Sequence, residues 1–370
     1  MRDGLLGLFL CGDVMLGRGV DQILPQPGDP ALREAYVRDA RTYVELAEQV
    51  NGPIQYPVDY SWPWGDALPI LDEFTPDARI VNLETSVTRS DDFALGKAVH
   101  YRMNPANLPC LSVARPDACV LANNHVLDFG RRGLAQTLDS LYGAQVTTVG
   151  AGRDLEQAQR HAVITVDGFT RFLVYAVGMA TGGVPASWAA TPDRSGVDFA
   201  DTPSDVAADD LITRIQRIKQ PGNIVVVSIH WGPNWGYAVS RAEVRFAHRL
   251  IDGGVDVVHG HSSHHPRPIE IYRGKLILYG CGDFIDDYEG ITGYEEYRDD
   301  LRLIYLVSVQ PGSGELASVM MVPLQARQLR LHHASTGDAV WMRTVLERVS
   351  HNFGTRIDLD SDGRLILRLA

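Results

Sequence analysis

Five separated segments of the sequence place metal-binding side chains directly after apolar stretches. Divalent cations are held by carboxylate and amide oxygens and by imidazole nitrogens, which must converge to within about 2.0–2.4 Å of one ion. A single Asp after a strand is more often a turn or cap residue, but five such segments in one chain predict a metal centre. The segments are Gly12-Asp13, Asn82-Leu83-Glu84, Asn123-Asn124-His125, Ile229-His230-Trp231 and residues 259–265, which read His-Gly-His-Ser-Ser-His-His.

The apolar stretches that precede these segments are predicted to be buried strands. They cover roughly residues 5–12, 78–84, 118–125 and 223–230, and a further one begins at residue 255. Apolar spacing and end signals predict helices over residues 31–49, 131–143, 203–219, 240–252 and 339–351. Further strands are predicted at 301–309 and 316–323, with a tight hairpin through Arg273-Gly274. Alternating strands and helices indicate a layered α/β domain, in which the carboxyl ends of strands converge on a site.

No internal repeat or low-complexity linker divides the 370 residues. We therefore predict one metal-dependent catalytic domain over residues 1–330, with residues 331–370 forming a C-terminal helix and hairpin extension packed on it. The composition, 45% hydrophobic and 22% charged, is that of an ordinary globular protein. The formal net charge of -12 argues against a nucleic-acid partner, which would need clustered Lys and Arg.

The cysteines and the N-terminal segment indicate the cellular compartment of the protein. Cys11, Cys110, Cys119 and Cys281 show no CxxC spacing and lie among apolar residues, so buried free thiols in a reducing compartment are predicted. The apolar stretch at the N-terminus is too short to span a bilayer and runs into Asp13, which indicates a first buried strand and not a signal peptide. We predict no membrane anchor and a cytoplasmic location.

Several segments resemble the signature blocks of the CapA-like family. This family takes its name from poly-γ-glutamate capsule biosynthesis and is related to the calcineurin-like metallophosphoesterases. The resemblance covers roughly residues 5–330 and implies a four-layer metallophosphoesterase-like sandwich, with two mixed β-sheets flanked by helices. The segments are GDVMLGR, VNLETSVT, LANNHVLDFG, IHWG and GHSSHHPRPIEIYRGKLILYGCGDF.

The resemblance also implies roles for individual residues. His125 matches the general acid of phosphoesterases, and Asp128 is placed to accept its other N–H and fix its tautomer. Asp13, His125 and His264 are the candidates for proton transfer. The candidate metal ligands are Asp13, Glu84, Asn124, His230, His261 and His264, and the donor set suits Mn, Zn, Fe, Mg or Ca.

Departures from the phosphoesterase pattern change the expected chemistry. The first block usually reads Asp-x-His, but Met15 removes that imidazole, and the last block is wider than Gly-His-x-His. Phosphoesterases use two ions about 3.5–4 Å apart, so a second ion would be held weakly here. A single cation can instead polarise an amide carbonyl, so that two bases invert the α-carbon, or it can activate a water that hydrolyses the amide.

Several functions follow from this chemistry. The family includes poly-γ-glutamate proteins and a peptide-epimerising branch of lasso-peptide pathways. With no anchor or export signal predicted, we favour a cytoplasmic peptide-tailoring enzyme that epimerises a Cα centre. The alternatives are a poly-γ-glutamate biosynthesis or hydrolysis protein of the CapA type, a phosphoesterase, and a non-catalytic assembly partner. The expected substrate is a peptide or a poly-γ-glutamyl chain.

Four further side chains are candidates for substrate binding. Arg18 and Arg102 could hold a substrate carboxylate, with ion pairing as the alternative role. Trp231 and Trp235 follow His230 and could line a cleft, although aromatic residues near a strand end more often pack in the core. The acidic run that begins at Asp283 is interpreted as a solvated loop, with cation binding as its alternative.

Overall fold

Two β-sheets pack face to face in the computed structural model of the chain, which describes residues 4–167 and 170–369. The first sheet is mixed and has the order β20-β21-β18-β17-β1-β2-β5-β6, with β16 beside β1 and β19 beside β18. Its strands are β1 (Leu6–Val14), β2 (Ala78–Leu83), β5 (Ala118–Val120), β6 (Thr148–Val149), β16 (Asp283–Ile285), β17 (Leu301–Val309), β18 (Leu316–Arg327), β19 (Arg330–His333), β20 (Arg356–Leu359) and β21 (Leu365–Arg368).

The second sheet is also mixed and is built around parallel strands. It has the order β11-β9-β12-β13-β15-β14, with β8 beside β9. Its central strand β12 has the run NIVVVSIH and is buried throughout, which is typical of a parallel strand covered on both faces. The strands are β8 (Ala162–Thr165), β9 (Arg171–Met179), β11 (Phe199–Ala200), β12 (Asn223–His230), β13 (Val257–His261), β14 (Ile269–Tyr272) and β15 (Lys275–Leu278).

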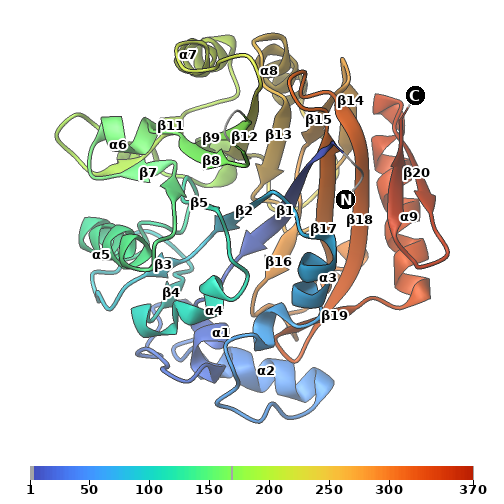
Figure 1. Ribbon diagram of the computed structural model, residues 1–370. Coiled ribbons are helices and arrows are strands. Elements are labelled where there is room, and N and C mark those ends of the chain that lie inside the picture. Colours follow the sequence, from blue (N-terminus) through green and yellow to red (C-terminus); the bar gives the residue numbers. More distant parts are fainter. Residues whose placement is uncertain (1–3, 168–169, 370) are drawn as a thin grey trace.

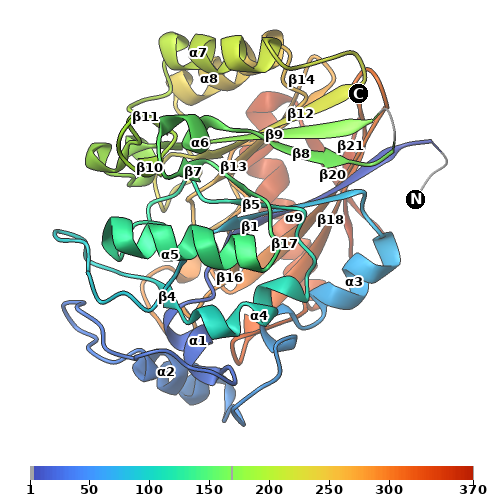
Figure 2. The same cartoon turned by 60° about the vertical axis from the view of Figure 1, so that its left-hand side comes forward.

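Helices cover the outer face of each sheet, and Figure 2 shows the resulting layers stacked from top to bottom. The first sheet is covered by α1 (Arg18–Ile23), α2 (Arg41–Asn51), α3 (Ala67–Phe74), α4 (Pro109–Ser112) and α5 (Gly130–Gly143). The second is covered by α7 (Asp205–Gln216) and α8 (Arg241–Asp252). Smaller elements are α6 (Leu155–Gln159) and the strand pairs β3 (Ser86–Val87) with β4 (Arg102–Met103) and β7 (Ala151–Gly152) with β10 (Gly196–Val197).

The core between the sheets is made of side chains that alternate along facing strands. Leu8, Leu10 and Ile80 of the first sheet are fully buried against Val174 and Val226 of the second. Burial of this apolar area from both sheets is what holds them together. The four-layer sandwich of two mixed sheets flanked by helices is thus confirmed.

The C-terminal segment continues the first sheet. Helix α9 (Thr336–Ser350) buries Met342 and Leu346 in the core between the sheets, and it lies at the right-hand edge in Figure 1. The hairpin β20–β21 pairs through β21 with β18. The helix and the hairpin are therefore found where the sequence predicts them, while the boundary at residue 330 stays a prediction.

One predicted helix is too long. The helix expected over residues 31–49 begins only at Arg41. Ahead of it the chain turns back on itself through a bridge between Ala31 and Asp39, and the Leu32 N–H donates to the Arg38 carbonyl. The apolar spacing was misleading there, since Tyr36 is fully exposed. Among the described residues, we find no helix with the length and apolar character needed to cross a membrane.

Gly12 lets β1 approach the loop before β16. The Asp13 N–H donates to the Gly282 carbonyl at 2.9 Å, and a Cβ on Gly12 would lie 1.8 Å from that same oxygen. We expect Gly12→Ala to lower the free energy of unfolding by about 1–3 kcal/mol or more, because backbone must shift to make room. Urea unfolding measures this, with Gly143→Ala as control, since its Cβ would meet nothing within 4 Å. Equal unfolding midpoints for the two variants would contradict the close approach.

Candidate metal centre

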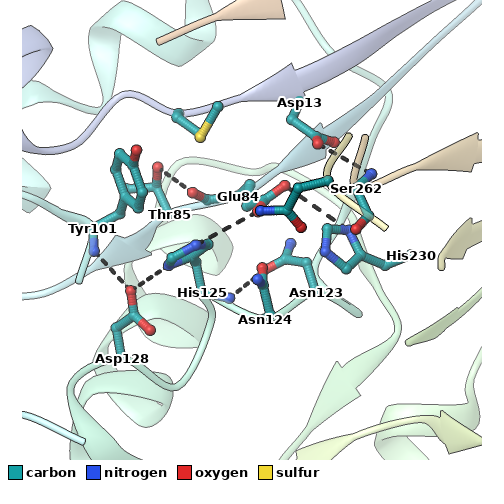
Figure 3. Close-up of polar contacts among 12 residues, drawn as sticks. Asp13, Glu84, Thr85, Tyr101, Asn123, Asn124, His125, Asp128, His230 and Ser262 are labelled. Atoms are coloured by element: carbon teal, nitrogen blue, oxygen red, sulfur yellow. Dashed lines mark hydrogen bonds and ion pairs between the residues drawn. The ribbon is translucent and has the colours of Figure 1, made fainter. Parts of the chain in front are cut away.

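The five predicted segments meet at the carboxyl ends of strands from both sheets. Asp13 stands near the end of β1, Glu84 follows β2, His230 ends β12 and His261 ends β13. The ligand atoms of Asp13, His230 and His261 lie within 4.8 Å of one another, and all three residues are buried. Figure 3 shows Asp13, Glu84 and His230 close together, each at the end of a different strand.

Asn82 holds the two carboxylates of the cluster in place. Its Nδ2 donates to Asp13 Oδ1 at 2.7 Å and to Glu84 Oε2 at 3.2 Å. Glu84 Oε2 lies 3.9 Å from His230 Nδ1, and Asp13 Oδ1 lies 3.9 Å from His261 Nδ1. His230 Nδ1 and His261 Nδ1 lie only 2.8 Å apart, so the carboxylates and imidazoles form one tight cluster.

Several buried polar atoms of the cluster have nothing to bond to. Within the described part of the chain, Asn124 Oδ1, His230 Nε2 and Asp283 Oδ2 are buried and have no hydrogen-bond partner. A buried polar atom that makes no hydrogen bond is costly, by roughly 1–3 kcal/mol each. Oxygen and imidazole atoms of this kind are satisfied when they bind a cation.

The electrostatics also suit a cation. Burial, and next the charge of Asp283, raise the pKa of Asp13 to about 7. Burial, followed by the charge of Asp13, raises the pKa of Glu84 well above its usual range. Burial and neighbouring histidines lower the pKa values of His230 and His261, so both rings are neutral and able to ligate. These residues fit a divalent cation, and the mixed donor set leaves the element open.

His125 forms the first of two histidine–carboxylate pairs beside the cluster. Its Nδ1 lies 2.6 Å from Asp128 Oδ2, and its Nε2 lies 3.7 Å from Glu84 Oε1. Burial is the largest effect on this ring and lowers its pKa to about 4, against the opposing charge of Asp128. The contact with Asp128 is the one that a tautomer-fixing role needs, and the role itself stays a prediction.

His264 forms the second pair. Its Nδ1 lies 3.0 Å from Asp283 Oδ1, and its Nε2 lies 3.0 Å from Asn234 Nδ2. Burial alone would lower the pKa of His264, but the charges of Asp283 and Asp13 raise it. The ligand atoms that lie within 4.8 Å of one another belong to Asp13, His230 and His261 and do not include His264, so a ligand role for His264 stays a prediction.

A small pocket of about 200 Å³ opens beside the cluster. Both histidine pairs reach it, since His125 and His264 contribute to its walls together with Lys97, Asn234 and Tyr288. The pocket thus joins the candidate ligands to two groups able to carry protons.

The two arginines proposed for substrate binding, Arg18 and Arg102, pair with other groups of the protein. Arg18 is 3% exposed and pairs with Asp287 and Glu34 beneath the pocket, so its charge is neutralised in the interior. Arg102 donates to the carbonyls of Ser90 and Asp29 and does not line the pocket. Ion pairing and packing, the alternative roles, account for both side chains.

The two tryptophans proposed for substrate binding, Trp231 and Trp235, have different surroundings. Trp231 is fully buried against Phe246 and Tyr279, under the helices of the second sheet, and it does not line the pocket. Trp235 is half-buried, stacks on Tyr294 with ring centroids 3.9 Å apart, and lies 5.2 Å from the His264 ring. Trp235 does not line the pocket either, but it lies beside His264, which does, so its substrate-binding role stays a prediction. Trp231 is a packing residue.

Two polar residues of the site were missed by sequence reasoning. Lys97 had no motif around it. Asp283 was assigned to a solvated loop, yet it is 1% exposed and stands in register with Asp13 on the neighbouring parallel strand. A signal was present, because the tripeptide Cys-Gly-Asp occurs at residues 11–13 and again at 281–283.

Comparisons with known proteins give matches over most of the chain. The profile of the family described as "Bacterial capsule synthesis protein PGA_cap" matches residues 7–288. A probable polyglutamine synthesis accessory protein of Mycobacterium tuberculosis is 54% identical, over 97% of this chain and 94% of the relative. The PGA biosynthesis protein CapA of Bacillus subtilis is 25% identical, over 98% and 82%. Among solved structures, a 5'-nucleotidase precursor from Thermus thermophilus matches with a TM-score of 0.43 and 15% identity, over 93% of this chain and 58% of that one.

Proposed function

Because the chain belongs to the family of bacterial capsule synthesis proteins, we propose that it is a divalent-metal-dependent enzyme that cleaves amide bonds of a glutamyl polymer. The names of its relatives refer to polyglutamine, PGA and capsule synthesis. They favour the CapA-type alternative over the lasso-peptide epimerase preferred in the sequence analysis. The observation that carries the proposal is the buried group of Asp13, His230 and His261 next to Glu84, which lines a pocket together with His125.

The ligand group has a defined part in this function. Asp13, His230 and His261 would hold the cation, with Glu84 and Asn124 beside them. When bound, a divalent cation supplies Lewis acidity to a carbonyl oxygen or to a water. The neutral histidines need lose no proton to bind it, and Asn82 already fixes the Asp13 and Glu84 carboxylates.

His125 is the residue placed to move a proton. Hydrolysis of an amide adds the oxygen of water to the carbonyl carbon, and the leaving nitrogen gains a proton. Asp128 accepts from Nδ1, so Nε2 is the free nitrogen of the ring and faces the pocket side at Glu84. Proton transfer at Nε2 gives His125 the general acid and base role that the leaving amine requires.

Epimerisation is the second candidate, and one observation favours it. The pocket has histidine–carboxylate pairs in two of its walls, His125 with Asp128 and His264 with Asp283. Inversion of an α-carbon needs one group to remove the α-proton and another to return a proton from the opposite face. Hydrolysis needs only one such pair.

A single experiment separates the two reactions. The protein is incubated with poly-γ-glutamate in D₂O and with Mn, Zn, Fe, Mg or Ca in turn, and new amino termini and α-carbon deuterium are both measured. Hydrolysis gives shorter chains without deuterium at internal α-carbons. Deuterium without shortening would replace hydrolysis by epimerisation. Neither product, with poly-γ-glutamate or with peptides under any of these metals, would overturn the enzymatic proposal.

A further inference from the structure

Lys97 lies between the turn that carries the candidate ligand Asn124 and the His125–Asp128 pair. Its Nζ donates to the Asn124 carbonyl and, at 2.5 Å, to Asp128 Oδ1. Nζ is also 3.2 Å from His125 Nδ1 and 5.1 Å from the centre of the Trp188 ring. The side chain is only 15% exposed, so the ammonium group is surrounded by protein groups.

The two acceptors of Lys97 belong to residues with different tasks. Asn124 carries the buried Oδ1 that has no hydrogen-bond partner among the described residues, and it is a candidate ligand. Asp128 holds the His125 ring. The close contact between His125 Nδ1 and Asp128 Oδ2 puts the ring proton on Nδ1, so the hydrogens of Lys97 go to Asn124 and Asp128. One ammonium group therefore connects the ligand turn to the proton-transfer pair.

Several hydrogen bonds tie the segment that carries Lys97 to Asp128. Residues 88–101 connect β3 to β4 and are described without helix or strand. The segment is tied to Asp128 at two other points, where Ala94 N–H donates to its carbonyl and Tyr101 N–H donates to Oδ2. Lys97 adds the charge that balances the buried Asp128 carboxylate.

We propose that Lys97 is a positioning residue that fixes the Asn124 ligand turn and the His125–Asp128 pair relative to each other. The proposal rests on the proposed function, since it presumes that both parts serve one reaction. A substrate carboxylate is not the partner of Lys97, because Asp128 already neutralises it. Lysine suits this place since a compact ammonium can reach a carbonyl and a carboxylate at once, whereas a planar guanidinium needs more room.

The chain offers a matched control. Lys219 also donates to a backbone carbonyl, that of Gly254 at 2.7 Å, and to a buried carboxylate, Asp256 Oδ2 at 2.8 Å. It lies at the far end of β12, beside Asn223, away from the pocket. Lys97→Met and Lys219→Met thus remove the same pair of contacts from two places.

The test measures Mn²⁺ affinity of the metal-free protein by calorimetry, together with kcat and KM on poly-γ-glutamate. Lys97→Met is expected to weaken Mn²⁺ binding about 10–100-fold and to lower kcat with little change in KM, as loss of ligand-orienting contacts does. Lys219→Met is expected to change neither. If Lys97→Met fails to fold, Lys97→Gln, whose amide still donates to one acceptor, is expected to give an intermediate loss. Affinity equal to that of the unaltered protein in the Lys97 variant would overturn the proposal.

A second readout keeps this test separate from the proposed function. The ¹⁵N chemical shifts of the His125 ring in metal-free protein report its tautomer. They are expected to show a proton on Nδ1 in the unaltered chain and mixed tautomers in Lys97→Met. Unchanged shifts would overturn the positioning role, whatever the protein does with metals. Failure of the unaltered chain to bind any divalent metal would count against the proposed function alone.

Discussion

Asp13→Asn is expected to remove divalent-metal binding and, with it, cleavage of the polymer. Asparagine keeps the size of the side chain and an oxygen for Asn82, but it removes the charge that faces His230 and His261. Loss of a residue that only orients a ligand typically costs 10–100-fold in metal affinity. Loss of the central carboxylate itself should therefore cost more than about 100-fold.

Thermal and chemical unfolding measure this loss without a substrate. A cation that binds only the folded chain adds about 2.7 kcal/mol to the free energy of unfolding at 100 times its Kd. We expect that gain in the unaltered protein and none in Asp13→Asn. Asp198→Asn is the control, because Asp198 is buried and paired with Arg214, and it should lose stability yet keep the gain from metal. If neither the unaltered protein nor Asp13→Asn cleaves the polymer, and Asp13→Asn keeps the cellular function of the protein, the non-catalytic assembly partner would be supported instead.

The positions of the ligands were predictable because they depend on rules that act along a single strand. Continuous apolar runs mark buried parallel strands, and the residue that ends such a run lies at the edge where the site forms. That reasoning placed Asp13, Glu84, His230 and His261 together. Asn124 follows from the same rule, although three residues separate it from the end of β5.

Strand alternation would also have corrected the prediction for Trp231. Successive side chains on a strand point to opposite faces, so if His230 faces the other sheet and the site, the next residue faces the helices. Trp231 does so, packing on Phe246 of α8. His259 and His261 are two residues apart and share a face, where Ser228 Oγ lies within 3.0 Å of both rings.

The rest of the site depends on contacts between distant segments, which no local pattern encodes. Arg18 is neutralised by Asp287, 269 residues later in the chain. Lys97 reaches Asn124 and Asp128 from a segment without regular structure. Asp283 becomes a site residue only because β16 pairs with β1 in a register that sets it beside Asp13. Buried charges of this kind need the fold before their partners can be named.

His125→Gln is expected to separate chemistry from metal binding. Glutamine can occupy most of the space of the ring, but it cannot carry a proton between Asp128 and the pocket. Loss of a general acid or base typically lowers the rate about 10²–10⁴-fold, and we expect kcat to fall within this range. Affinity for Mn²⁺ should be largely retained, because His125 lies outside the Asp13–His230–His261 group.

The comparison of His125→Gln with Asp13→Asn decides what the histidine does. His161→Gln is the control, since His161 stacks on Tyr175 in the second sheet and should change neither kcat nor metal affinity. If His125→Gln loses metal as fully as Asp13→Asn, His125 is a ligand, and the proton must come from His264 across the pocket. If His125→Gln keeps both its metal affinity and its kcat, the His264–Asp283 pair transfers the proton and His125 does not. Only loss of kcat with metal retained assigns the proton to Nε2 of His125, the ring nitrogen that Asp128 leaves free.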